Sequence, residues 1–149
     1  MDTEKSIDVL NSLIQINNDR IEGYETASKE AEESDLKTLF SHFTETSLKC
    51  KAELVAEVER LGGKPIEGTT TSGKLYRVWM DIKSALTGSD RKAIVNSCEY
   101  GEDVAVQTYN DALSHNKDLT QEQIMMIKEQ HDAIKANHDK IKNLRDLMG

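Results

Sequence analysis

The sequence predicts an all-α fold, a four-helix bundle made of two antiparallel helical hairpins joined by one long crossover. The chain of 149 residues contains one proline and 8 glycines, and 31% of its residues are charged. This mix favours long helices over sheets. Apolar residues also recur at every third and fourth position over four long segments, as they do on bundle helices. Two of the links between these segments are short and one is long, which indicates hairpins on either side of a crossover.

The helices have the following expected bounds: 6–32 and 35–61 for the first hairpin, 90–114 and 120–148 for the second, and a crossover at 62–88 that carries a short helix at 75–86. The expected N-caps are Ser6 or Asp8, Ser34, Ser89 or Asp90, and Thr120, in chain order. Gly23 lies in the middle of the first helix, where glycine costs about 1 kcal/mol relative to alanine. We therefore expect Gly23 to admit a close neighbour. One face of the short helix carries its apolar residues, which are Leu75, Val78, Trp79, Ile82 and Leu86.

Composition and charge limit the classes of partner. A formal net charge of −8 argues against a nucleic-acid backbone or an anionic membrane surface. No apolar run approaches the roughly 20 residues of a membrane-spanning helix, and the first residues lack an apolar signal core. We expect a soluble cytoplasmic protein whose residues 1–149 form a single domain. Cys50 and Cys98 lie on apolar stripes without metal-ligand spacing, so we expect buried, reduced thiols.

The last helix is the most informative segment because two histidines interrupt its apolar stripe. The stripe consists of Ile124, Ile127, His131, Ile134, His138, Ile141, Arg145 and Met148. A polar group that faces a bundle core needs a partner. We expect carboxylates from the other helices to meet His131 and His138 inside the bundle.

Counting residues from each hairpin loop at 1.5 Å per residue gives approximate heights along the bundle. The count predicts one polar layer of Glu25, His42, Glu99 and His138, and a second layer of Glu53, Glu57, Glu102 and His131. Carboxylates combined with imidazoles suit iron, manganese or zinc. The candidate metal ligands are Glu25, Glu102, His131 and His138, and further candidates are His42, Glu53, Glu57 and Glu99.

One spacing argues against the usual di-metal centre of helical bundles. Such centres take a Glu-x-x-His pair from each of two helices. Here the residues three positions before the histidines are Leu39, Ala112, Lys128 and Lys135. A structural network of hydrogen-bonded Glu and His side chains is the alternative. Glu102 lies between Cys98 and Ala105 on an apolar stripe, and a buried carboxylate there needs a cation, a metal or a raised pKa.

Two hairpins with one long crossover have the connectivity of ferritin-like folds. Several motifs also occur together, namely 18–24 (NDRIEGY), 61–63 (LGG), Arg77 with Trp79, 101–103 (GED) with Tyr109, His138-Asp139 and 144–146 (LRD). With these motifs the chain resembles an uncharacterised bacterial family of ferritin-like four-helix-bundle proteins. The resemblance implies an architecture similar to that of rubrerythrins and ferritins, but no assigned activity.

These observations leave three functions open. The first is a non-catalytic or stress-related module with a buried polar network, acting through a protein partner or as a homo-oligomer. The second is a metal-binding oxidoreductase that uses iron or manganese and activates oxygen or peroxide at an open coordination position. The third is a zinc or mononuclear structural site without an open position.

Overall fold

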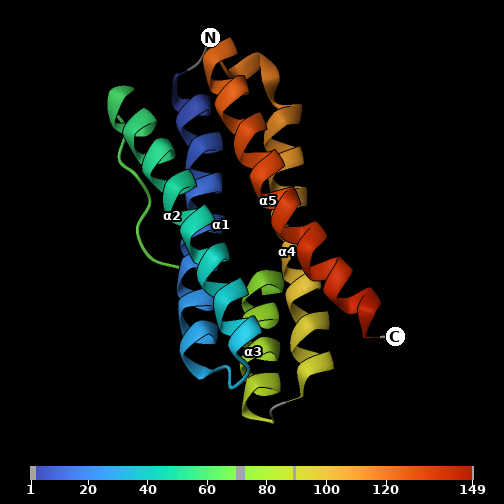
Figure 1. The fold of residues 1–149 in the computed structure, drawn as a ribbon. Helices are drawn as coiled ribbons and strands as arrows, with labels where there is room; N and C mark the ends of the chain where they lie inside the picture. The colour runs from blue at the N-terminus through green and yellow to red at the C-terminus, as the bar shows by residue number, and fades with distance from the viewer. Residues whose placement is uncertain (1–2, 70–72, 89, 149) are drawn as a thin grey trace.

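The computed structural model of the chain describes residues 3–69, 73–88 and 90–148, and within them it is all-helical (Figure 1). The elements are α1 (Thr3–Glu30), α2 (Ser34–Arg60), α3 (Gly73–Thr87), α4 (Arg91–Ser114), the 3₁₀-helix η1 (Asn116–Asp118) and α5 (Gln121–Leu147). The predicted all-α class is confirmed. No helix in the described part of the chain combines the length and the apolar character that crossing a membrane requires.

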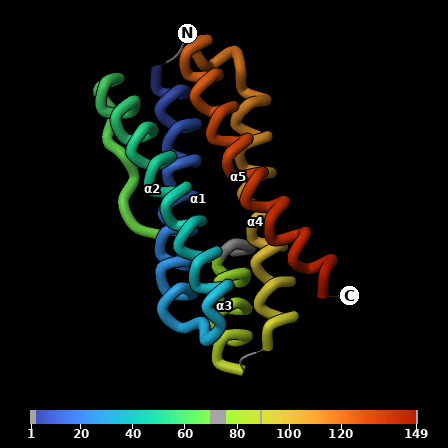
Figure 2. The backbone as a smooth tube through the Cα atoms, viewed as in Figure 1, coloured from blue at the N-terminus to red at the C-terminus, as the bar shows by residue number. Residues whose placement is uncertain are grey.

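The long connection after α2 changes the direction in which α4 runs, because a short link would make these two helices antiparallel. α1 and α2 form one antiparallel hairpin, and α4 and α5 form another (Figure 1). The connection after α2 runs back along the bundle and leads into α3, as the tube in Figure 2 shows. α4 consequently runs in the same direction as α2. α1 contacts α4 and α2 contacts α5, so the two hairpins share one core.

Side chains of α1 form hydrogen bonds that hold the connection after α2 against the first hairpin. The Asn11 amide donates from Nδ2 to the Lys64 carbonyl at 3.2 Å and accepts from the Ile66 amide at 2.9 Å. Two turns further along the helix, Asn18 Nδ2 donates to the Gly68 carbonyl at 3.0 Å. These bonds satisfy backbone groups that have no partner in a helix or strand.

The short helix α3 packs against both hairpins at two glycines. A Cβ atom on Gly23 would lie 2.3 Å from Cε3 of Trp79, and one on Gly101 would lie 2.9 Å from Cγ1 of Val78. The expectation that Gly23 admits a close neighbour is therefore confirmed, and the neighbour is Trp79. Val78, Ile82 and Leu86 are buried as predicted, whereas the Leu75 side chain lies outside the described part of the structure.

Two of the predicted caps are wrong. Ser6 and Asp8 lie inside α1, which begins at Thr3, and the Ser6 hydroxyl donates to the distant Asp118 carbonyl instead of to its own helix. The N-cap of α2 is Glu33 and not Ser34. Asp90 and Thr120 do cap α4 and α5, each accepting from a backbone amide three residues on. Ser89 lies outside the described residues.

Candidate functional site

An ion pair between α1 and α4 occupies the middle of the core. Arg20 Nη2 donates to Glu102 Oε1 at 2.6 Å, and Arg20 Nε donates to Glu102 Oε2 at 3.0 Å. Each side chain is only 1% exposed. Arg20 Nη1 also donates to the Ser47 hydroxyl on α2. The pair therefore connects three helices through a bidentate, charge-assisted contact.

The guanidinium lies over one aromatic ring, which belongs to a larger aromatic cluster. Arg20 Cζ lies 5.4 Å from the centroid of the Tyr24 ring, which stacks on Phe40 and meets Phe43 and Trp79 edge-on. Burial is the largest single influence on the pKa of Arg20 and lowers it, but the charge and hydrogen bonds of Glu102, together with smaller contributions from Tyr24 and Cys50, outweigh burial, so that this pKa is raised. Burial, followed by the Glu102 charge, holds the pKa of Tyr24 well above its ordinary value. Arg20 is therefore a cation and Tyr24 is neutral at physiological pH.

A second polar layer lies next to the ion pair and is built from amides. Asn17 Nδ2 donates to the Tyr109 hydroxyl at 2.9 Å, and that hydroxyl donates to Gln130 Oε1 at 2.7 Å. Gln130 Nε2 then reaches α2, where it donates to Glu53 Oε1 at 2.9 Å and to the Cys50 carbonyl at 3.3 Å. All four long helices contribute to this layer, so it fixes their relative heights.

The two cysteines are free and buried, as predicted. Burial is the main cause that raises the pKa of the Cys50 thiol to about 11, and it raises the pKa of Cys98 still further. A thiol needs to lose its proton before it can act as a nucleophile or bind a metal. Neither cysteine is therefore suited to thiolate chemistry near neutral pH.

The predicted stripe of α5 is correct at Ile127, Ile134 and Ile141, but its other positions are one residue out of register with the core. The interior positions are Gln123, Ile127, Gln130, Ile134, Asn137 and Ile141. The polar side chains that enter the core are thus amides, and the histidines that follow two of them lie at its edge. The side chains of His131 and His138 are each 17% exposed. The expectation that two imidazoles face a dry interior was wrong.

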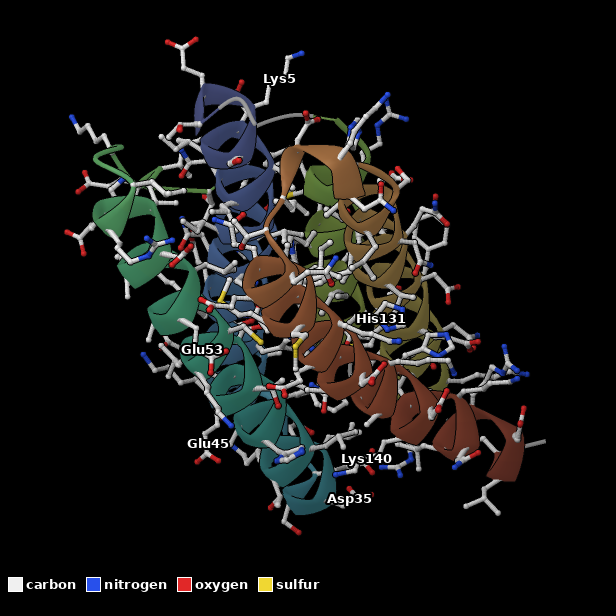
Figure 3. All side chains as sticks on the ribbon, turned by 90° about the horizontal axis from the view of Figure 1, so that it is seen from above. Lys5, Asp35, Glu45, Glu53, His131 and Lys140 are labelled. Atoms are coloured by element: carbon white, nitrogen blue, oxygen red, sulfur yellow. The ribbon has the colours of Figure 1, made fainter. Side chains whose placement is uncertain are left out.

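Several other candidates also lie outside the predicted layers. Glu25 and His42 are exposed, because the interior of their helices is taken by Tyr24 and Phe43. His42 Nε2 lies 3.1 Å from Lys140 Nζ, whose side chain is labelled on α5 in Figure 3. Glu102 binds Arg20 and not His131, which hydrogen-bonds to Asp132 at 3.0 Å.

Glu53 and Glu57 stand on α2 at the border with α5. Glu53, labelled in Figure 3, accepts from Gln130 as described above. Glu57 accepts from Gln123 Nε2 at 2.7 Å and from Arg60 Nη2 at 2.5 Å. Hydrogen bonds with Arg60 are the main cause that lowers the pKa of Glu57. Both carboxylates thus join α2 to the amides of α5 and do not meet the histidines.

One pair of predicted residues, Glu99 and His138, does come together, on the outer side of the α4–α5 hairpin. Glu99, Asp103 and His138 place one ligand atom each within 4.8 Å of the others. His138 Nε2 lies 2.5 Å from Asp103 Oδ1, and Arg145 Nη1 donates to Glu99 Oε1 at 2.6 Å. Asp103 was not among the predicted residues, although it lies four positions after Glu99 and therefore on the same helix face.

The comparison with protein-family models gives a match over most of the chain. A model described as "Domain of unknown function (DUF2383)" matches residues 5–115. The chain belongs to this family. The segment that matches the DUF2383 model includes α1 to α4, and hence both partners of the buried ion pair, whereas α5 follows it. No curated protein matches the chain at a significant level.

The interior of this DUF2383 protein does not suit the iron or manganese centre that its sequence suggested. Among the described residues the buried carboxylates are Asp19 and Glu102, and no histidine is buried. Both oxygens of Glu102 already accept hydrogen bonds from Arg20. A divalent ion would have to displace a bidentate guanidinium and would gain no imidazole ligand in return.

Arg20 on α1, Ser47 on α2 and the buried amides of α5 are interior residues that the sequence did not indicate. The position of Arg20 could have been found from the periodicity of the first helix. The buried positions Leu10, Leu13, Asn17, Arg20, Tyr24, Ala27 and Ala31 are spaced alternately by three and four residues. Residue type alone did not indicate Arg20, because an arginine is rarely buried unless it is paired.

Proposed function

We propose that the chain is a non-catalytic helical module of the ferritin-like class. In this proposal a guanidinium–carboxylate pair joins helices in the core, the region in which ferritin-like di-metal bundles carry their metal ligands. The observation that supports it best is the bidentate contact between Arg20 and Glu102, each 1% exposed. In this pair both oxygens of Glu102 already accept hydrogen bonds from Arg20. The connectivity of two hairpins and one long crossover supports the assignment to this class.

The amide layer supports the same proposal. Asn17, Tyr109 and Gln130 form a continuous chain of hydrogen bonds across the core, and such a buried network favours one arrangement of its helices. In an enzyme we would expect at least one of these polar groups to face a substrate cavity. Here they bond to each other and to the backbone.

A non-catalytic module acts through its surface, and we propose self-association of a cytoplasmic protein as its mode of action. Large apolar side chains that support this proposal include Leu48 on α2 and Met125 and Leu147 on α5, which are 47%, 62% and 85% exposed. Sedimentation velocity at increasing protein concentration tests it. We expect a mass above that of one chain, lowered by Met125→Glu. A monomer at every concentration would exclude self-association.

The experiment for the interior uses untagged protein and measures Fe(II) oxidation by dissolved oxygen, together with the iron retained per chain. We expect the wild-type protein to oxidise Fe(II) no faster than buffer does. Glu102→Gln should leave that rate unchanged, because Glu102 binds Arg20 and not iron. Iron oxidation by the wild-type protein that disappears in Glu102→Gln would overturn the proposal in favour of the oxidoreductase alternative.

A further inference from the structure

Three ligand atoms converge on the outer side of the α4–α5 hairpin, away from the buried ion pair. Glu99 and Asp103 are one helical turn apart on α4, and His138 faces them from α5. Their ligand atoms lie within 4.8 Å of one another, and in the described part of the chain no other group of three or more His, Cys, Asp or Glu side chains does so. Ligands about 2.1 Å from a shared ion are separated by distances of this order.

The imidazole of His138 is held by a carboxylate on its other nitrogen. His138 Nδ1 lies 3.2 Å from Asp139 Oδ1, while Nε2 lies 2.5 Å from Asp103 Oδ1. The short contact between Nε2 and Asp103 Oδ1 is a hydrogen bond with one proton between the two atoms. A metal ion bound by both groups would replace that proton. A carboxylate that orients a histidine in this way is the usual second shell of a metal ligand.

The surrounding charges also attract a cation to this place. Three carboxylates, those of Glu99, Asp103 and Asp139, lie around one imidazole. The positive groups that face them are Arg145, which donates to Glu99 at 2.6 Å, and Lys135, 3.3 Å from Asp139. Arg145 therefore neutralises the charge of the Glu99 carboxylate and would compete with a metal ion for it.

From this geometry we propose that Glu99, Asp103 and His138 bind one divalent transition-metal ion. One imidazole nitrogen with two carboxylate oxygens suits Zn²⁺ and similar ions better than Ca²⁺ or Mg²⁺, which prefer oxygen ligands alone. The ion would join α4 to α5 near the outer end of the hairpin. This site goes beyond the proposed function, because it lies outside the core and does not involve Glu102.

The same helix supplies a matched control. His131 lies one heptad before His138, is equally exposed at 17%, and is also followed by an aspartate to which it hydrogen-bonds. It differs in that it belongs to no cluster of carboxylates from α4 among the described residues. His138→Gln and His131→Gln therefore remove the same chemical group from two similar positions on one helix.

The test is calorimetric titration of untagged, metal-free protein with Zn²⁺ alone, with circular dichroism as a check that each variant is folded. We expect one ion per chain, and a loss of affinity of more than about tenfold in His138→Gln and about tenfold in Asp139→Asn. His131→Gln should bind like the wild-type protein. Absence of saturable Zn²⁺ binding, or an equal loss in both histidine variants, would overturn the proposal.

A further variant tests whether Glu99 is a ligand. Arg145→Gln releases Glu99 from its guanidinium partner, so we expect tighter Zn²⁺ binding. Binding no tighter than that of the wild-type protein would overturn the inclusion of Glu99. Failure of these titrations would not affect the interior proposal, because Glu102→Gln, which tests that proposal, leaves all three outer ligands in place.

Discussion

At the scale of single residues, Arg20 and Glu102 each depend on the presence of the other. Removing two charges from water costs several kcal/mol per ion even after the protein relaxes. The contact between them recovers that cost only because both carboxylate oxygens accept and Ser47 takes a further guanidinium hydrogen. Loss of either partner would leave the other as an uncompensated buried charge.

This dependence predicts the behaviour of single and double variants. Arg20→Met leaves Glu102 buried without a counter-charge, and we expect it to lower the free energy of unfolding by about 3–5 kcal/mol. Glu102→Leu should have a similar effect. The double variant should recover most of the loss, because it removes both charges together. Urea denaturation followed by circular dichroism measures all three.

An exposed ion pair is the control for these single and double variants. Arg60 and Glu57 form a contact of 2.5 Å at the end of α2, where the Arg60 side chain is 61% exposed. Solvent screens such a pair, so we expect Arg60→Met to change the stability very little. If the Arg20 and Glu102 single variants were equally harmless, the argument that each needs the other would be wrong.

At the scale of helices, the phase of a stripe is harder to predict than its existence. On α5 the isoleucines at 127, 134 and 141 belong equally to a stripe through Ile124, His131 and His138 and to one through Gln123, Gln130 and Asn137. The two stripes differ by one residue, or about 100° of rotation. Residue type favoured the stripe with more apolar members, but the structure selects the amides.

Packing against the other helices explains that selection. Gln130 can satisfy both ends of its amide inside the core, because Tyr109 donates to its oxygen and α2 accepts from its nitrogen. The partners of a polar residue come from distant segments, so sequence periodicity alone could not identify them.

The packing of α3 gives a second prediction at this scale. Gly23→Ala places a methyl group where Trp79 Cε3 and Cζ3 would lie at 2.3 and 2.4 Å. The ring meets Tyr24 edge-on, so a shift of Trp79 disturbs that contact. We expect a net loss of about 1–2 kcal/mol, since the overpacking cost exceeds the helix propensity gained from alanine. Trp79 is the one tryptophan of the chain, so its fluorescence reports any displacement of α3.

Gly88→Ala is the matched control for this variant. A Cβ atom there would approach other atoms no closer than 3.8 Å, which is an ordinary van der Waals contact. The fluorescence spectrum and the urea midpoint should both resemble those of the wild-type protein. A Gly23→Ala protein with unchanged fluorescence and stability would contradict the close packing of Trp79 on α1.

At the scale of the whole molecule, link lengths predicted more than side-chain chemistry did. Two short links and one long connection were sufficient to predict two hairpins and a crossover, because a short link forces neighbouring helices to be antiparallel. The position of α3 could not be predicted in the same way. It depends on two surfaces, at Gly23 and Gly101, which belong to different hairpins.

Helix α5, the fourth long helix of the bundle, lies outside the segment that matches the family model. That segment ends at residue 115, whereas Ile127, Ile134 and Ile141 on α5 are fully buried. Gln130 also joins α4 to α2 within the amide layer. A chain of residues 1–115 would therefore expose the apolar faces of α2 and α4 and leave the Tyr109 hydroxyl without its acceptor.

We consequently expect residues 1–115 alone to retain helical content without cooperative unfolding. Urea denaturation of this fragment should give a broad transition, and the fragment should bind a dye specific for exposed apolar surface. Adding a peptide of residues 116–149 should restore a sharp transition, because α5 can bury its isoleucines against the fragment without a covalent link. If the fragment unfolded as cooperatively as the full chain, α5 would not belong to the same core, and the amide layer could not be what fixes the heights of the four helices.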